Sequence, residues 1–229
     1  MTRTTNARLA GFTYLFYMGV GISNEVLMGR AKGAEGVAAK LARIAEHTTE
    51  VRTATLLAVL ECLSALVLGV ALYGVTRDVD HELALLALVC RAAEGIINSV
   101  NVTGNQELLW LAQARNGVGT LDPATTQTLG TFLLIPGGPI AAIFFAVGST
   151  LFSYLLLRGQ MVPASLAGWG VLASVLLVVG LPLQVAGFFT GPLTGYQWVP
   201  VIGFTLVLGL WLLMKGVAAP TRQERLAST

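Results

Sequence analysis

Long apolar segments alternate with shorter polar ones along the chain, and six of the apolar segments are long enough to cross a bilayer. A membrane-spanning helix needs about 20 mainly apolar residues. The six predicted spans are Leu9–Met28, Thr53–Thr76, Leu83–Gln113, Pro139–Leu157, Pro163–Phe189 and Trp198–Met214. Each is predicted to be an α-helix, because backbone polar groups in lipid must find hydrogen bonds within their own segment.

Two irregular features are expected around the third and fourth spans. At 1.5 Å per residue the third span is about 46 Å long, which exceeds the roughly 30 Å hydrocarbon core. It must therefore tilt, project beyond the membrane or break near Gly104. The segment Thr125–Ile135 is predicted to form a short interfacial helix, and the cluster Pro136–Pro139 is predicted to bend the chain after it.

The longest polar segment joins the first two spans and has a helical pattern of its own. Its apolar positions recur at spacings of four and three, at Val37, Leu41, Ile44, Thr48 and Val51. This pattern predicts an amphipathic helix. Such a helix can lie on the membrane surface, cap the helical bundle or serve as a solvated connector, and the sequence leaves these alternatives open.

The composition agrees with a membrane protein. Of 229 residues, 55% are apolar and 11% are charged, against about 25% charged in an ordinary soluble domain. Between Asp122 and Lys215 the sole Asp, Glu, Lys, Arg or His is Arg158. A net charge of +2 gives no basic surface for nucleic acid. The predicted fold class is therefore all-α: a polytopic membrane helical bundle of six transmembrane helices plus the amphipathic helix, forming a single membrane-embedded domain over residues 1–229.

The predicted partners follow from the same composition, and no cofactor is expected. Membrane lipids surround the apolar spans, no nucleic acid is expected, and a homo-oligomer is left open. Cys62 and Cys90 lie inside apolar runs, where thiols usually behave as small apolar residues. His47 and His81 show no metal-ligand spacing. No metal site and no cofactor are therefore predicted.

The third predicted span carries a row of polar side chains at helical spacing. Arg91, Glu94, Asn98, Asn101 and Asn105 follow one another at intervals of three and four residues. They share one face of a helix, because each residue turns the helix by about 100°. Ionisable groups inside a span normally face the interior of the bundle or a water-filled cavity. The row is therefore predicted to line a helix seam or a wet cavity.

The first two spans offer faces that match this row. Tyr14, Tyr17 and Glu25 share a face of the first span, and Glu61 lies on a small-residue face of the second. The second and third spans are antiparallel, and this places Glu61 at the depth of Arg91 and Glu94. We hypothesise that Arg91 and Glu94 form a fixed ion pair and that Glu61 is the protonatable group.

Three roles of these groups remain open: structural glue between helices, a ligand cavity, and a proton or ion pathway. The leading interpretation is an integral membrane protein whose intramembrane polar cavity binds or passes a small or lipophilic molecule. The predicted ligand-binding residues are Arg91, Asn98, Asn101, Asn105, Tyr14, Tyr17 and Glu25.

The alternative interpretation is an intramembrane acid/base enzyme that acts on a lipophilic substrate, such as an isoprenoid cyclase or isomerase. In it Glu61 donates a proton and Glu94 accepts one, so these are the catalytic candidates. The sequence does not decide whether the protein is an enzyme.

Scattered positions along most of the chain resemble one bacterial membrane family. They are Arg52-x-x-x-Leu56, Leu72-Tyr73-x-x-x-x-Arg77, Leu85-Leu86-Ala87-Leu88-x-x-Arg91-x-x-Glu94, Ile143-Phe144-Phe145-x-x-Gly148, Tyr154-Leu155-x-x-Arg158-Gly159, Pro163 and Gly168. The family is catalogued as domain of unknown function 4386. Its members usually have a serine at the position of Gly159 and a basic residue at that of Ala164.

The resemblance implies a six-span bundle in a bacterial cytoplasmic membrane and no established activity. The charged C-terminal tail and the uncharged last loop favour an orientation with both termini in the cytoplasm.

Overall fold

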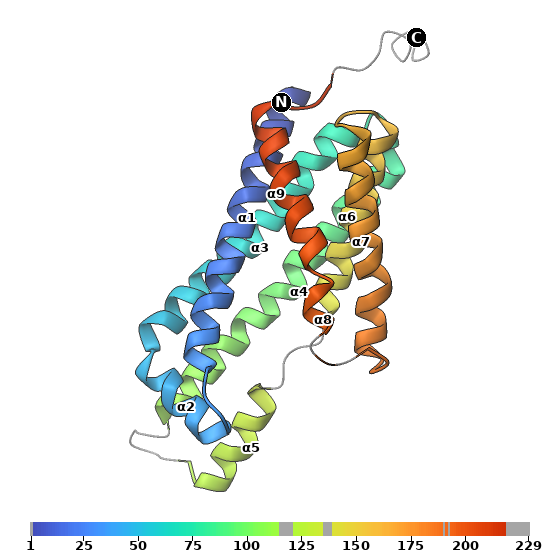
Figure 1. Ribbon diagram of the computed structural model, residues 1–229. Coiled ribbons are helices and arrows are strands. Elements are labelled where there is room, and N and C mark those ends of the chain that lie inside the picture. Colours follow the sequence, from blue (N-terminus) through green and yellow to red (C-terminus); the bar gives the residue numbers. More distant parts are fainter. Residues whose placement is uncertain (1, 115–120, 135–138, 190, 192, 219–229) are drawn as a thin grey trace. The chain divides into compact units, whose positions relative to one another are not determined.

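The computed structural model describes residues 2–114, 121–134, 139–189, 191 and 193–218. In those residues the chain forms helices and no strand, which confirms the all-α class (Figure 1). The helices are α1 (Arg3–Lys32), α2 (Val37–Glu46), α3 (Thr48–Thr76), α4 (His81–Ala114), α5 (Pro123–Leu134), α6 (Ile140–Arg158), α7 (Ala164–Val185), α8 (Leu193–Tyr196) and α9 (Val199–Met214).

Five of the described helical segments are long and apolar enough to cross a membrane. They are Thr48–Thr76, His81–Ala114, Ile140–Arg158, Ala164–Val185 and Thr194–Met214. They correspond to the second to sixth predicted spans. Helix α1 is long, but it is not among the five, so the count of six spans stays a prediction.

Two of the finer predictions about these helices can be compared with the structure. Helix α4 continues through Gly104 to Ala114, so the break considered at that glycine does not occur. A helix does form where Thr125–Ile135 was predicted, as α5 (Pro123–Leu134). The bend predicted at Pro136–Pro139 falls on residues 135–138, outside the described residues.

The chain divides into two compact units, and each is described by itself. Unit 1 contains the described residues of Met1–Tyr17, Ser64–Gly95 and Pro139–Thr229. Unit 2 contains those of Met18–Leu63 and Ile96–Gly138. Helices α1, α3 and α4 therefore contribute residues to both units. The single domain over residues 1–229 stays a prediction.

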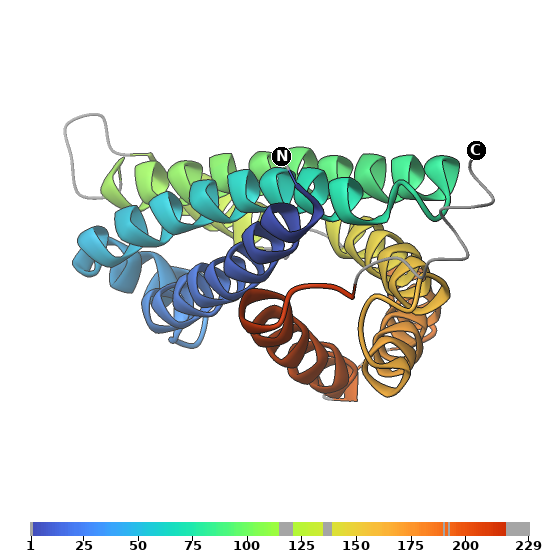
Figure 2. The same ribbon diagram turned by 90° about the horizontal axis from the view of Figure 1, so that it is seen from above.

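In unit 1, α6 and α7 form an antiparallel pair that also packs against α9 (Figure 2). The turn between α6 and α7 is short because Gly159 and Met161 donate backbone hydrogen bonds to the last turn of α6, and Pro163 precedes the first turn of α7. Leu72, Phe152 and Phe204 are buried in the core of this unit. The core holds helices that are apolar on most faces, as expected for spans within lipid.

One end of unit 1 is stabilised by polar contacts of Asp80, which precedes α4. Its carboxylate accepts a hydrogen bond from the backbone N–H of Leu83 at 3.1 Å and another from Arg158 Nη1 at 2.9 Å. These contacts, the backbone hydrogen bond first, lower the pKa of Asp80 from its ordinary value. The side chain therefore caps α4 and links its start to the end of α6.

In unit 2, the amphipathic segment folds as a separate helix against its own core. Helix α2 ends at Glu46, and α3 begins one residue after His47. Leu41 and Ile44 are fully buried in a cluster that includes residues of α1, α3 and α4. Helix α2 also packs on α5, where a Cβ at Gly130 would lie 2.6 Å from Val37. The apolar face of α2 therefore packs into the core of unit 2, and the role of this helix at the membrane stays a prediction.

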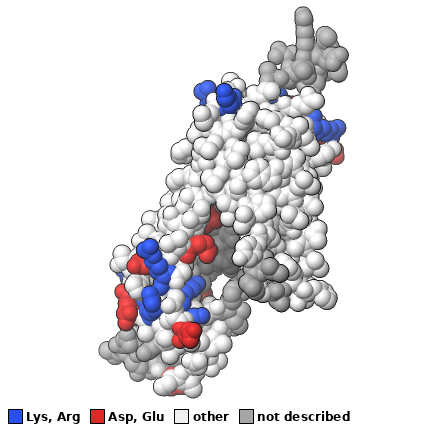
Figure 3. All heavy atoms as spheres, in the orientation of Figure 1, with Lys and Arg blue, Asp and Glu red and all other residues white. Residues whose placement is uncertain are grey.

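The surfaces of the two units differ in charge. Large apolar side chains are exposed along the spans, including Leu56, Val70, Leu172 and Leu176. In the view of Figure 3, unit 1 is mostly uncharged away from its upper end, whereas charged side chains of both signs gather over α2 and the adjoining part of α1. Unit 1 thus exposes the kind of surface that lipid covers.

Candidate functional site

A buried ion pair lies in unit 1, where the sequence predicted Arg91 to pair with Glu94. Arg91 Nη1 lies 2.7 Å from Glu94 Oε2, and each side chain is 1% exposed. Both residues belong to α4, one turn apart, as their spacing requires. Tyr17 of α1 donates a hydrogen bond of 2.7 Å from its hydroxyl to Glu94 Oε1. The carboxylate therefore meets a cation at one oxygen and a hydroxyl donor at the other.

Aromatic rings cover the guanidinium of Arg91. Its Cζ lies 5.3 Å from the ring centre of Tyr17 and 5.0 Å from that of Phe145 on α6. At these distances the π face of a ring attracts a cation. Among the described residues, Arg91 Nε and Nη2 donate no hydrogen bond of normal geometry. The two ring faces and the carboxylate of Glu94 thus surround most of this charged group.

Two glycines make room for the stem of Arg91. A Cβ built at Gly69 of α3 would lie 3.0 Å from Arg91 Cβ. A Cβ at Gly148 of α6 would lie 3.2 Å from the carbonyl oxygen of Ala87 and 3.3 Å from Arg91 Cδ. Helices α3 and α6 therefore approach α4 closely on both sides of the arginine, and the site is tightly filled.

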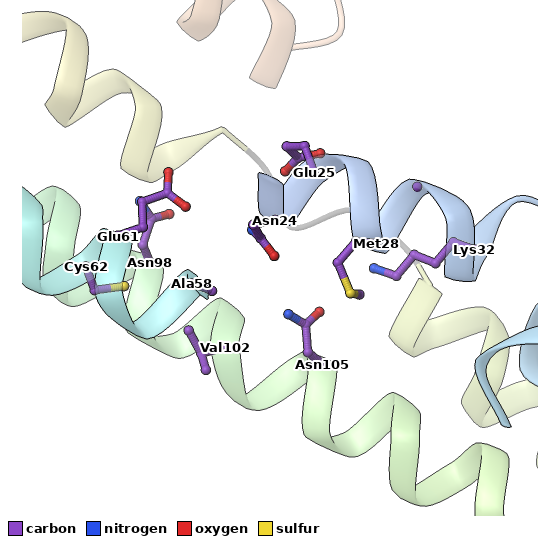
Figure 4. A pocket seen from close by; sticks show the side chains of 11 residues that line it. Asn24, Glu25, Met28, Lys32, Ala58, Glu61, Cys62, Asn98, Val102 and Asn105 are labelled. Carbon is purple, nitrogen blue, oxygen red and sulfur yellow. The ribbon is translucent and has the colours of Figure 1, made fainter. Parts of the chain in front are cut away.

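A separate polar pocket lies within unit 2 and has a volume of about 350 Å³. Its lining comes from Asn24, Glu25, Met28, Gly29 and Lys32 of α1, Ala58, Glu61 and Cys62 of α3, and Asn98, Val102 and Asn105 of α4. Figure 4 shows the ends of the Asn24, Asn105 and Lys32 side chains directed into the space between α1 and α4. The pocket thus combines three amides with three ionisable groups.

The position of Glu61 in this pocket depends on a glycine of α1. A Cβ at Gly21 would lie 3.0 Å from Glu61 Oε1, so the absence of a side chain there lets the carboxylate approach α1. Asn24 lies three residues further along α1, and its Oδ1 is buried without a hydrogen-bond partner in the described part of the chain. An acceptor in that state needs a donor that the described residues do not supply.

Lys32 brings the single lysine of the lining and is half-buried. Burial lowers the pKa of its ammonium group, while Glu25 acts in the opposite direction. The ammonium group is therefore partly desolvated and close enough to Glu25 to be influenced by its charge.

The structure distributes the predicted site residues over the two units. Tyr14, Tyr17, Arg91 and Glu94 belong to unit 1, where Tyr14 is buried in the core. Glu25, Glu61, Asn98 and Asn105 line the pocket of unit 2, and the side chain of Asn101 lies outside the described residues. The predicted meeting of Glu61 with Arg91 and Glu94 concerns two separate units and stays a prediction.

Several contributors, among them Asn24, Phe145 and Lys32, were not chosen from the sequence. Phe145 looked like any other aromatic residue of an apolar span, and nothing in its pattern marked it as a ring over a cation. Lys32 lay beyond the predicted end of the first span at Met28. It is seven residues after Glu25, however, and that spacing would have put both on one face of a longer helix.

A metal centre finds no support in the described residues, where no group of three or more His, Cys, Asp or Glu side chains could hold an ion.

The apolar helices and their buried polar groups define the class as a multi-pass helical membrane protein. The chain belongs to the family described as Domain of unknown function (DUF4386), whose model matches residues 9–216. This match confirms the resemblance seen in the sequence. No curated protein and no solved structure matches the chain.

Proposed function

We propose that this protein is a multi-pass membrane protein that binds a small polar molecule in the pocket of unit 2. The observation that carries the proposal is a space of about 350 Å³ lined by amides and ionisable groups from three helices. Ligand pockets usually measure about 300–1,000 Å³ and hold a few polar groups that orient the ligand. Side chains that only joined helices would fill this space rather than surround it.

The character of the lining favours a polar occupant over a lipophilic one, which the sequence also allowed. Asn24, Asn98 and Asn105 each offer a donor and an acceptor, and Glu61 adds a carboxylate. A lipophilic occupant would remove water from these groups without replacing its hydrogen bonds. The acid/base enzyme stays a prediction, since its two carboxylates, Glu61 and Glu94, belong to different units.

We further propose that α1 also crosses the membrane, over Leu9–Met28, which brings the number of spans to six. Four large apolar side chains, Phe12, Phe16, Ile22 and Val26, are exposed in this segment, and Glu25 near its end is exposed as well. The polar side chains Thr13 and Tyr14 are buried instead. This arrangement is that of a helix whose outer face contacts lipid. It accounts for a low average hydropathy without excluding a span.

The proposed location is a bacterial cytoplasmic membrane with both termini in the cytoplasm. Six spans return the chain to the side where it began, whereas five would leave the termini on opposite sides. A reporter that fluoresces only in the cytoplasm is therefore expected to fluoresce when fused to either terminus. Fluorescence from one terminus alone would contradict the proposal that α1 crosses the membrane.

A pocket-filling substitution tests the binding function. Gly29 lines the pocket, and a Cβ there would meet no described atom within 4 Å, so Gly29→Leu adds bulk at an open position. Gly19→Leu on the same helix is the matched control, because position 19 is equally open but does not line the pocket. Native mass spectrometry of the full-length protein in dodecyl maltoside is expected to show a small bound molecule in the wild type and in Gly19→Leu. The bound mass should disappear in Gly29→Leu, and its persistence there would refute the proposal.

A further inference from the structure

We propose that the ligand of this pocket is a small organic cation with a primary ammonium group. This inference rests on the proposed binding function and names the chemical class of the ligand. It is drawn from the charges of the lining, from one buried acceptor without a donor, and from the kinds of side chain that surround the space.

The charges of the lining favour a cation. Glu25 and Glu61 bring two carboxylates and Lys32 brings one ammonium group, so the charged side chains among the described lining residues sum to one negative charge. Glu25 is exposed, and Glu61 and Lys32 are half-buried; a ligand that takes water from these groups is favoured when its charge opposes their net charge. A ligand with one positive charge would bring the sum to zero, whereas an anion would double the imbalance.

The hydrogen-bonding groups favour a ligand that donates. Asn24 Oδ1 is buried and accepts no hydrogen bond from the described residues. Figure 4 shows its side chain directed into the pocket, with Asn105 opposite. The Glu61 carboxylate, positioned against Gly21, supplies further acceptors. An ammonium group has three N–H donors, enough to reach an amide oxygen and a carboxylate together.

The absence of aromatic residues from the lining distinguishes among cations. Of the described residues that line the pocket, none is Phe, Tyr or Trp. Quaternary ammonium groups have no N–H and are typically bound by the faces of aromatic rings. This pocket offers oxygen acceptors instead, which select for N–H donors. The aromatic cover of a cation in this protein lies around Arg91, in unit 1.

The test compares three probes, of which two differ in their N–H groups and the third is an anion. Ethanolamine carries a primary ammonium group, choline carries the same chain on a quaternary one, and glycolate is an anion of similar size. Binding is measured by calorimetry on the full-length protein in dodecyl maltoside. This detergent has no ammonium group and therefore does not compete with the probes. We expect ethanolamine to bind at least tenfold more tightly than choline, and glycolate not to bind. Equal binding of choline, tighter binding of glycolate, or no binding of ethanolamine at millimolar concentration would overturn the inference.

Variants of Asn24 separate the role of the acceptor from an effect on folding. Asn24→Leu removes the oxygen and is expected to weaken ethanolamine binding at least tenfold. Asn24→Asp keeps an acceptor and is expected to retain binding. Gln127→Leu, an exposed position on α5, is the control that should leave binding unchanged. Similar binding by Asn24→Leu and Asn24→Asp would refute the role given to this oxygen.

Two sources of a primary ammonium group can be told apart in nanodiscs. Free ethanolamine is titrated into nanodiscs with and without phosphatidylethanolamine. Loss of binding when this lipid is present identifies a lipid headgroup as the source, and unchanged binding identifies a free amine. The binding function itself is judged by the bound mass and Gly29→Leu. If the molecule found by mass spectrometry is an anion or is neutral, the proposed binding function is supported and the ammonium class of the ligand is refuted.

Discussion

Removal of one partner of the buried ion pair should destabilise the protein far more than removal of both. The perturbation is Arg91→Met, which leaves the Glu94 carboxylate without its cation. Glu94→Gln is the complementary change and keeps an acceptor for the Tyr17 hydroxyl. The third variant combines the two substitutions, and together with the wild type they form a double-mutant cycle.

The magnitude follows from the distance and the burial. Charges 2.7 Å apart attract by about 6 kcal/mol at an effective dielectric constant of about 20. Both side chains are 1% exposed, so most of this attraction offsets the desolvation of the two groups. Breaking a buried pair on one side costs about 3–5 kcal/mol. Replacing both partners costs much less, because no unpaired charge remains. The coupling free energy should therefore be about 3 kcal/mol or more.

The assay is unfolding in mixed dodecyl maltoside and SDS micelles, followed by circular dichroism. Arg77→Met is the control, because Arg77 and its neighbour Asp78 are 57% and 67% exposed and 3.7 Å apart. An exposed pair contributes at most about 1 kcal/mol. If Arg91→Met is no more destabilising than Arg77→Met, or if the two single effects add without coupling, the ion pair is not an energetic unit.

Two further predictions concern unit 1. Gly148→Ala should lower the free energy of unfolding by about 1–3 kcal/mol through overpacking. A Cβ at Gly168 would meet no described atom within 4 Å, so Gly168→Ala should leave this free energy unchanged or raise it. Thermal unfolding of both variants checks this prediction, and equal unfolding midpoints would contradict it. The pKa of Asp80 is lowered by a backbone hydrogen bond at the start of α4 and then by Arg158. The contribution of the ionised Asp80 side chain to stability is therefore present above the unfolded-state pKa. It is lost as the pH falls through the lower folded-state pKa. Asp80→Asn keeps a capping oxygen but cannot titrate, so the unfolding midpoint of this variant should fall less than that of the wild type between pH 5 and pH 2. Equal decreases of the two unfolding midpoints would exclude this linkage.

The spans could be predicted closely because the bilayer restricts what can cross it. The last span was predicted as Trp198–Met214, and α9 is Val199–Met214. Errors concentrate at the helix ends. Helix α1 begins at Arg3 and reaches Lys32, beyond both ends of the predicted Leu9–Met28. The predicted end of the fifth span at Phe189 was wrong in the other direction, because α7 ends at Val185. Polar residues can extend a helix beyond its apolar segment and a helix can end within one, so apolar length does not give the boundary.

The ion pair could also be predicted, since two charged residues one turn apart on a lipid-buried helix have few other partners. Its surroundings could not. The ring of Phe145 over the guanidinium, and the space left by Gly69 and Gly148, depend on how α3 and α6 approach α4. Periodicity determines which residues share a face of one helix. It does not determine which residues of another helix meet that face.

The polar row on α4 therefore has two kinds of surroundings, and each favours a different one of the roles that the sequence had left open. Arg91 and Glu94 are buried among aromatic rings and close glycine contacts. Asn98 and Asn105 border an open pocket in the other unit. A substitution in the first group should lower stability whether or not a ligand is present. A substitution in the second should leave the unfolding midpoint of the ligand-free protein nearly unchanged and remove the rise that a ligand produces. If Asn105→Leu destabilises the ligand-free protein as much as Arg91→Met does, the pocket is part of the structural seam and the division fails.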